Sequence, residues 1–291
     1  LKNAFRIKDI RKKLFYTFCM MVVIRMGSQL PVPGVNRNYF SQWFAQQSND
    51  AFNFFSAFTG GSFEKMSIFA LSITPYITSS IIIQLLTIAI PALEEMHKDG
   101  EDGRKKIASI TRYVTVALAL IESIAMTVGF GRSGLIPDLN FLKGFMVVTA
   151  LTAGSTLLMW IGERITQNGV GNGISIVLMI NILSSIPSDI TGLFEMFVKG
   201  KTLAHGALAA LIIIAVILVT IVLVIVLNDA TRKIPVQYAK KMQGRKMVGG
   251  QSTFIPLKVN TAGVIPVIFA SSLMSIPQMI VAFTGANVGT G

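Results

Sequence analysis

The residues that could carry catalytic chemistry do not gather into a catalytic pattern in this 291-residue chain. The two histidines, His97 and His205, stand outside its apolar runs, and neither an HExxH zinc-protease motif nor a GxSxG nucleophile elbow occurs. The single cysteine, Cys19, can form neither an internal disulfide nor a cysteine-based metal cluster. We therefore expect no enzymatic activity, no metal and no cofactor.

Two charged residues interrupt long apolar runs, Arg25 near the N-terminus and Glu122 further along. Ionisable groups at membrane depth are costly, so each is a functional candidate by default. The alternative is that each is a buried polar tie between helices.

The composition places these residues in a membrane protein. Apolar residues make up 52% of the chain, charged residues only 14%, and the mean hydropathy is +0.63. Soluble domains carry about 25% charged residues, so the net charge of +12 cannot belong to a hydrophilic nucleic-acid-binding domain. The sequence predicts an all-α, multi-pass transmembrane helix bundle.

A bilayer core requires about 20 mostly apolar residues per helix. Seven runs meet this requirement, and the fifth is the weakest because Pro187 and Asp189 lie near its end. The predicted spans are 14–30, 68–90, 113–130, 145–162, 174–194, 207–227 and 259–283.

The distribution of Lys and Arg predicts the orientation. With a cytoplasmic N-terminus, nineteen of the 26 cations fall on the cytoplasmic side, six on the other side, and Arg25 within a span. This bias follows the positive-inside rule and supports all seven spans, because removing one would invert every later loop.

The second and seventh spans are more polar than the others, with Ser, Thr, Gln and Pro residues at membrane depth. Such residues are tolerated mainly where they face protein or a watery cavity. Hydroxyl-mediated helix packing is the alternative for either span alone, whereas the two together favour a cavity.

Residues 53–63 form a short aromatic stretch, too short to cross a membrane, in a loop assigned to the outer side. Stretches of this length are commonly re-entrant or interfacial, and a plain lid on the outer face is an equal alternative. The loop 228–258 has seven cations against the single Asp229. It suits an anionic partner such as RNA or an acidic protein, or else anchors the chain to anionic lipid.

Several motifs in order along the chain resemble the bacterial SecY family, the central subunit of the Sec protein-conducting channel. They are QLPVPGV at 29–35, SIFALSITPYI at 67–77, GNGISI at 171–176, IPVQYA at 234–239, GGQST at 249–253 and PLKVN at 256–260. The family has ten transmembrane helices in two inverted halves, and the resemblance covers the first seven.

The resemblance implies roles for particular residues. The family's pore ring would correspond to Ile77, Ile81, Ile182, Ile268 and Ile276. Its plug would correspond to residues 51–66, with Phe54, Phe55, Phe58, Gly60 and Gly61. Its lateral gate would include Thr74, Gln84, Glu122, Ser271 and Ser272. Its partner-binding loop would include Arg232, Lys233, Lys240, Lys241, Arg245 and Lys246.

The resemblance also implies an organisation and a function. Residues 1–13 would form an amphipathic cytoplasmic helix, 14–194 the first five spans, and 195–291 the next two with their basic loop. The chain would pass unfolded secretory polypeptides across the bacterial cytoplasmic membrane and membrane-protein helices laterally into it. Expected partners are SecE, SecG, SecA or the ribosome, ribosomal RNA at the basic loop, signal sequences, nascent polypeptides and membrane lipids.

Two other classes of function compete with a channel. A secondary transporter would also use broken helices and inverted repeats, but it needs mid-membrane carboxylates, and only Glu122 is available. An intramembrane hydrolase would need a catalytic pair that the sequence does not offer.

Overall fold

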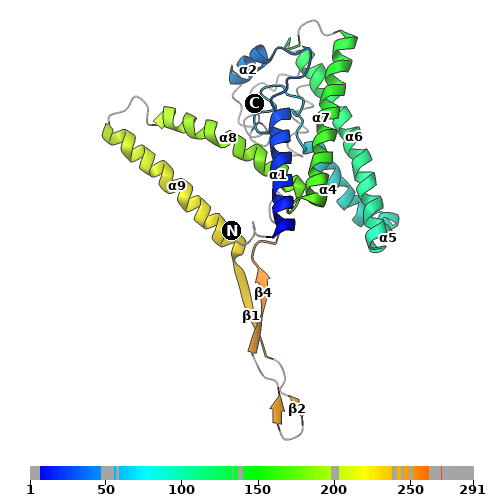
Figure 1. Cartoon of the computed structure of the whole chain (residues 1–291), viewed down its shortest axis with the longest axis vertical. Coiled ribbons are helices and arrows are strands. Elements are labelled where there is room, and N and C mark those ends of the chain that lie inside the picture. The colour runs from blue at the N-terminus through cyan, green and yellow to red at the C-terminus, as the bar shows by residue number, and fades with distance from the viewer. Residues whose placement is uncertain are drawn as a thin grey trace, which may run out of the picture. The chain divides into compact units, whose positions relative to one another are not determined.

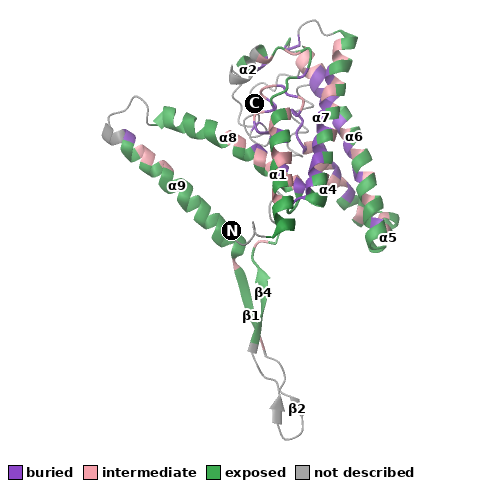
Figure 2. Cartoon of the chain, viewed as in Figure 1, coloured by how far each residue is buried: buried purple, intermediate pink, exposed green. Residues whose placement is uncertain are grey.

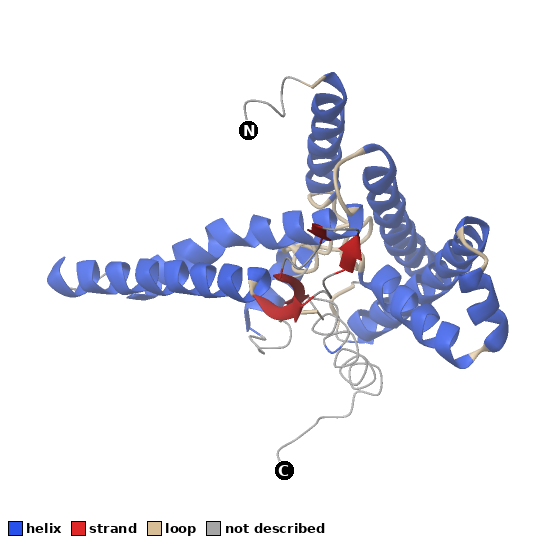
Figure 3. Ribbon diagram, turned by 90° about the horizontal axis from the view of Figure 1, so that it is seen from below, coloured by secondary structure: helices blue, strands red, loops and turns tan. Residues whose placement is uncertain are grey.

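The computed structural model describes residues 7–46, 56, 59–132, 134–136, 140–197, 203–237, 241–243, 246–248, 252–261 and 270. Helices dominate these residues, and strands occur in one region only, after the last long helix (Figures 1 and 3). The helices are α1 (Lys8–Gly27), α2 (Arg37–Gln46), α4 (Thr74–Ala89), α5 (Pro91–Lys98), α6 (Glu101–Arg132), α7 (Phe141–Asn168), α8 (Gly173–Phe197) and α9 (Leu203–Asp229). The strands are β1 (Thr231–Gln237), β2 (Lys241–Gln243), β3 (Lys246–Val248) and β4 (Ser252–Lys258).

Four described helices are long and apolar enough to cross a membrane: α6, α7, α8 and the 206–229 part of α9. They confirm the third to sixth predicted spans, including the fifth, which continues through Pro187. The seventh predicted span, 259–283, lies almost entirely outside the described residues.

The second predicted span, 68–90, differs from the structure at its start. Residues 68–73 form turns, and α4 begins at Thr74 with Pro75 in its first turn, where the missing N–H of proline costs nothing. The helix then breaks at Ile90, and α5 follows at an angle of 102°. The pair can count as one broken span, which brings the described total to five.

The first predicted span is helical, but it is not separate from the predicted N-terminal helix. Residues 8–13 continue directly into the apolar part of α1, so one helix runs from Lys8 to Gly27. Its first two turns hold Lys8, Arg11, Lys12 and Lys13, so α1 as a whole is more charged than the four helices that are apolar enough to cross a membrane.

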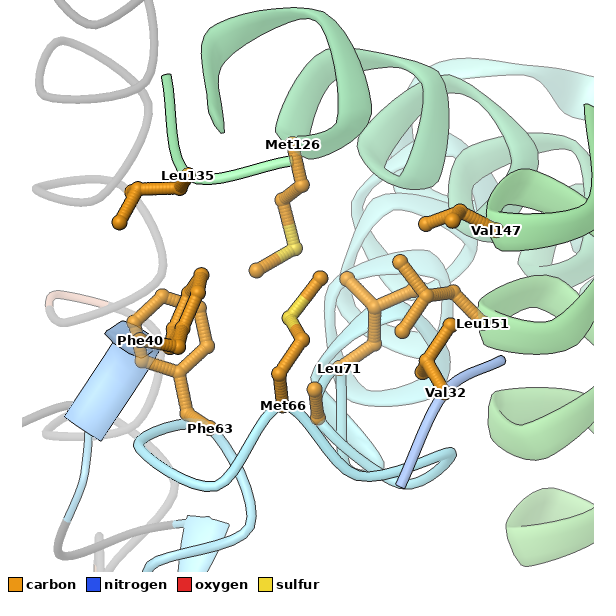
Figure 4. Close-up of a cluster of buried hydrophobic side chains, with 10 residues drawn as sticks. Val32, Phe40, Phe63, Met66, Leu71, Met126, Leu135, Val147 and Leu151 are labelled. Atoms are coloured by element: carbon orange, nitrogen blue, oxygen red, sulfur yellow. The ribbon is translucent and has the colours of Figure 1, made fainter. Parts of the chain in front are cut away.

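The chain divides into two compact units, residues 189–268 and the remainder. In the remainder, α7 packs against α6 and α1, and α4 packs against α6. One buried apolar cluster joins Val32, Phe40, the turns around Met66, α6 and α7; Figure 4 shows Met66 and Met126 facing one another between the Phe40 and Phe63 rings and the aliphatic side chains. A second cluster joins Ile24 of α1, Phe69, Ile73, α7 and Val177 of α8.

The 189–268 unit consists of the end of α8, α9 and the strands. Helix α9 is exposed along nearly all of its apolar length within the chain (Figure 2). Such a surface requires an apolar environment such as lipid.

The basic segment predicted as a loop instead forms two antiparallel strand pairs, β1 with β4 and β2 with β3. Pro235 and Pro256 fit this ribbon because the register places both in non-hydrogen-bonded pairs, opposite Phe254 and Lys233. The alternate pairs carry the hydrogen bonds between the strands, as the 3.0 Å bond from the Val259 N–H to the Ala230 carbonyl shows.

Candidate functional site

The described part of the predicted plug segment, Ser56 and residues 59–66, is folded back into the helical unit. Thr59 is fully buried and Ser62 is 2% exposed, so this is not a solvent-facing lid. The Thr59 hydroxyl donates to the Ser56 carbonyl at 3.1 Å, and the Gly61 N–H donates to the same carbonyl at 3.1 Å. Ser56 in turn donates to the Glu64 carboxylate at 2.6 Å, which closes a compact polar turn.

The two glycines of this turn have backbone angles that favour glycine. Gly60 has φ +63° and Gly61 has φ +72°. A Cβ at Gly60 would lie 2.7 Å from the Asn181 carbonyl oxygen of α8, whereas a Cβ at Gly61 would meet nothing within 4 Å. Gly60 is therefore required both for its conformation and for close approach to α8.

Helix α8 holds this region through polar side chains. The Ser184 hydroxyl donates to the Asn181 carbonyl at 2.6 Å and approaches the Gly60 carbonyl at 3.4 Å. The Asn181 amide donates to the Ser72 hydroxyl at 3.1 Å, and the Ser155 hydroxyl of α7 donates to the Ser72 carbonyl at 3.2 Å. None of these polar side chains was among the predicted site residues; the visible signal in the sequence was Asn181, an amide inside the apolar run of α8.

Three of the five predicted ring isoleucines are described. Ile77 and Ile81 lie one turn apart on α4 and are half-buried, and Ile77 packs on the cluster that includes Val177 of α8. Ile182 lies on α8 with 43% of its surface exposed. Ile268 and Ile276 lie outside the described residues.

The predicted lateral-gate residues lie on two helices. Thr74 begins α4 and is half-buried, Gln84 lies further along the same helix and is exposed, and half-buried Glu122 lies on α6. The structure adds a buried hydroxyl seam between these helices, where Ser79 hydrogen-bonds to Thr115 and donates to the Thr111 carbonyl at 3.4 Å. Ser271 and Ser272 lie outside the described residues.

The predicted partner-binding cations lie on the strand pairs. Arg232 and Lys233 are exposed on β1, and the Lys233 ammonium lies 4.7 Å from the centre of the Phe254 ring on β4. Because successive residues of a strand face opposite ways, Arg232 lies on the other face. Lys241 begins β2 and Lys246 begins β3, while Lys240 and Arg245 lie outside the described residues.

The fold and the site define a multi-pass helical membrane protein in which a short irregular segment is packed among the spans. The family model described as SecY matches residues 67–290, and the chain belongs to the SecY family. The resemblance read from the sequence motifs is thereby confirmed.

Curated relatives are similar over nearly the whole chain. The protein translocase subunit SecY of Streptomyces galbus is 44% identical over 99% of this chain and 68% of its own length. That of Halalkalibacterium halodurans is 45% identical over 99% of this chain and 67% of its own length.

Solved structures share the fold. A protein-conducting channel matches with a TM-score of 0.62 and 19% identity, covering 94% of this chain and 59% of that one. Sec61 in the canine ribosome-channel complex from the endoplasmic reticulum matches with a TM-score of 0.61 and 18% identity, over the same shares of the two chains. The chain thus spans less than two thirds of the channel structures that it resembles. The curated relatives in its family are named for translocation rather than for catalysis.

Proposed function

We propose that this chain supplies the larger part of a protein-conducting channel subunit, which passes unfolded polypeptides across a membrane and releases apolar helices laterally into the bilayer. The observation that carries the proposal is the buried turn at Gly60, an irregular segment seated against the middle of a membrane helix. Irregular backbone at membrane depth is tolerated where it is enclosed by protein or lines a cavity. The relatives are named protein translocase subunits, which supports a polypeptide as the cargo.

In this proposal the ring isoleucines form a dry constriction. Ile77 and Ile81 share one face of α4, and Ile182 presents a large exposed side chain on α8. Branched apolar side chains offer water no hydrogen bonds, so a ring of them empties of water and blocks ions. The same side chains can separate to fit around a passing chain.

The turn at Gly60 acts as the removable plug of the constriction. Its own hydrogen bonds, from Gly61 to Ser56 and from Ser56 to Glu64, keep it compact when it leaves α8. Displacement breaks the neutral Ser184–Gly60 contact with α8 and withdraws Phe63 from the buried apolar cluster.

Helices α4 and α6 form one side of the lateral gate. Their seam is made of small hydroxyl residues, Ser79 against Thr111 and Thr115, rather than interlocking leucines. These hydrogen bonds tie α4 to α6, while Thr115 also donates to the Thr111 carbonyl of its own helix at 2.7 Å, so the two helices can move together as one side of the gate.

The basic strand pairs dock a cytosolic partner, the motor SecA or the ribosome, and ribosomal RNA is a candidate for direct contact. Arg232 and Lys233 project from opposite faces of β1, so a partner can engage cations on both sides. The chain works in the bacterial cytoplasmic membrane with its N-terminus in the cytoplasm, beside SecE and SecG, with signal sequences and nascent chains as cargo and lipid along α9.

The proposal is tested in sealed vesicles that contain the full-length protein with its partner subunits and a cytosolic motor. We expect an unfolded secretory polypeptide to become protected from external protease, and a small solute such as an amino acid not to accumulate. Accumulation of the solute without protection of the polypeptide would show a transporter instead. Protein-free vesicles and vesicles without the motor are the controls.

A further inference from the structure

Ser72 is an unusual residue in the turns that precede α4. Its φ of +53° lies in the left-handed region, which a residue with a side chain adopts only when its surroundings impose it. Two helices supply that constraint: Ser155 of α7 donates to the Ser72 carbonyl at 3.2 Å, and Asn181 of α8 donates to its hydroxyl at 3.1 Å. All three side chains are buried, at 2%, 1% and 3% exposure.

The hydrogen-bonded junction of Ser72, Ser155 and Asn181 lies between the constriction and the plug segment of the proposed channel. Ser72 is two residues before α4, whose first turns carry Ile77 and Ile81. Asn181 directly precedes Ile182 and, through its own carbonyl, contacts the Ser184 hydroxyl that approaches Gly60. A Cβ at Gly60 would lie 2.9 Å from the Asn181 Cα, so the plug segment touches the backbone of the same residue.

The ordinary alternative is that Asn181 is a polar tie between packed helices. A tie of that kind joins two helices. Asn181 instead bonds Ser72, a left-handed residue outside any helix, and also contacts the left-handed turn at Gly60. Moving Asn181 would therefore disturb both the start of α4 and the seat of Gly60.

We propose that Asn181 is a positioning residue that couples the constriction to the plug segment, so that the two are held closed, and released, together. This inference rests on the proposed function. With the Asn181–Ser72 hydrogen bond intact, α8 fixes the first turn of α4 and provides the seat for Gly60. Without it, Ser72 loses one of its two constraints, and both the ring and the plug shift toward the open arrangement.

The test uses the full-length protein with its partner subunits in a background in which Cys19→Ser, together with Ser substitution of every other cysteine of the complex, removes the native thiols. Asn181→Leu removes the amide while keeping the branched shape of the side chain, and Ser72→Gly removes the acceptor while suiting the left-handed backbone. The matched control is Ser185→Ala, because among the described residues the Ser185 hydroxyl donates to the Ile182 carbonyl of its own helix, at 3.1 Å.

Two readouts are taken on each variant. Resting ion conductance in planar bilayers reports on the constriction, and labelling of Lys65→Cys by an impermeant maleimide reports on the plug segment. Loss of one neutral hydrogen bond should raise both by roughly twofold to tenfold, by similar factors, with no change for Ser185→Ala. The double variant Asn181→Leu/Ser72→Gly should exceed the single variants little, because both remove the same bond.

The inference is wrong if conductance and labelling change independently, or if neither changes in variants that remain monodisperse. Should Asn181→Leu fail to fold, Ser72→Gly alone decides the question, because it leaves α8 unaltered. The protease-protection assay on the unsubstituted protein separates the channel function from the coupling. If that protein translocates normally while conductance and labelling are unchanged in both variants, the proposed function stands and the coupling is refuted.

Discussion

Replacing Gly60 with alanine is the sharpest perturbation of the plug segment that the structure offers. The Cβ would lie 2.7 Å from both the Asn181 carbonyl oxygen and the Ser184 hydroxyl, and the backbone has a φ of +63°. The left-handed conformation costs a residue with a Cβ about 1–2 kcal/mol. The clash with the backbone of α8 adds about 1–3 kcal/mol, as in other overpacked sites.

Gly61→Ala is the matched control. Gly61 is also left-handed, with a φ of +72°, but nothing lies within 4 Å of its Cβ position, so only the conformational cost applies. The difference between the two variants isolates the contact with α8. The lower value for the clash, about 1 kcal/mol, corresponds to an about fivefold larger displaced fraction for Gly60→Ala, because each 1.4 kcal/mol is a factor of ten.

The assay is the resting conductance of the full-length channel in planar bilayers, with size-exclusion profiles to confirm that both variants fold. Gly60→Ala should leak substantially more than Gly61→Ala, which should leak about as much as the unsubstituted channel because the compact turn carries its left-handed strain in both positions. Equal leakage in the two alanine variants would mean that the close approach of Gly60 to α8 does not hold the plug segment in place.

Three further experiments test other parts of the molecule. Gly154→Ala in α7 should lower stability by about 1–3 kcal/mol, because its Cβ would collide with the Ile68 carbonyl. Gly192→Ala in α8, with open space around it, should be neutral or slightly stabilising; thermal unfolding in detergent compares the two, and similar losses would contradict the packing argument. Ile77→Asn should raise resting ion conductance, because one amide gives water a hydrogen-bonding partner in a dry ring, while Ile213→Asn in α9 should not; equal conductance would leave Ile77 as a packing residue. Lys233→Glu should weaken binding of the motor or ribosome roughly fivefold at low salt, and the difference should nearly vanish near 1 M salt, where exposed charges more than about 3 Å apart are largely screened; affinity independent of this charge at low salt would make the strand pair a topology anchor only.

The spans were predictable because a run of about 20 apolar residues matches the thickness of the bilayer core when it is helical. The 206–229 part of α9 matches the predicted span 207–227 within two residues at each end. The start of α4 was misplaced by six residues, although Pro75 after Thr74 is a typical signal of a first helical turn. The continuous apolar run through Ile68 and Phe69 concealed that signal.

The strands at 231–258 were missed because the cations dominated the interpretation. Alternation was present: Arg232, Ile234 and Val236 share one face of β1, and Thr253, Ile255 and Leu257 share the matching face of β4. The two prolines argued against strands, yet a two-stranded ribbon has an open edge on each side, where a missing N–H costs nothing.

The junction at Ser72 could not be predicted from one sequence. Its bond to Asn181 joins residues 109 positions apart, and neither residue type nor local spacing specifies such a pairing. The family resemblance named the apolar ring and the glycines, whose types are distinctive. The polar side chains that connect them, Ser72, Ser155 and Asn181, are visible only once α7 and α8 are packed against the turns.

The chemistry of this junction suits a closure that must open without unfolding. An ion pair buried at this depth would be costly to break, because separation leaves uncompensated charges. A purely apolar contact would offer nothing to the amide groups of a polypeptide that displaces it. Neutral hydrogen bonds among Asn181, Ser72 and Ser184 lie between these limits, since each lost bond costs little if another polar group replaces it. In the proposed function, the backbone of a translocating polypeptide carries one donor and one acceptor at almost every residue, so that polypeptide can replace the bonds that its entry breaks.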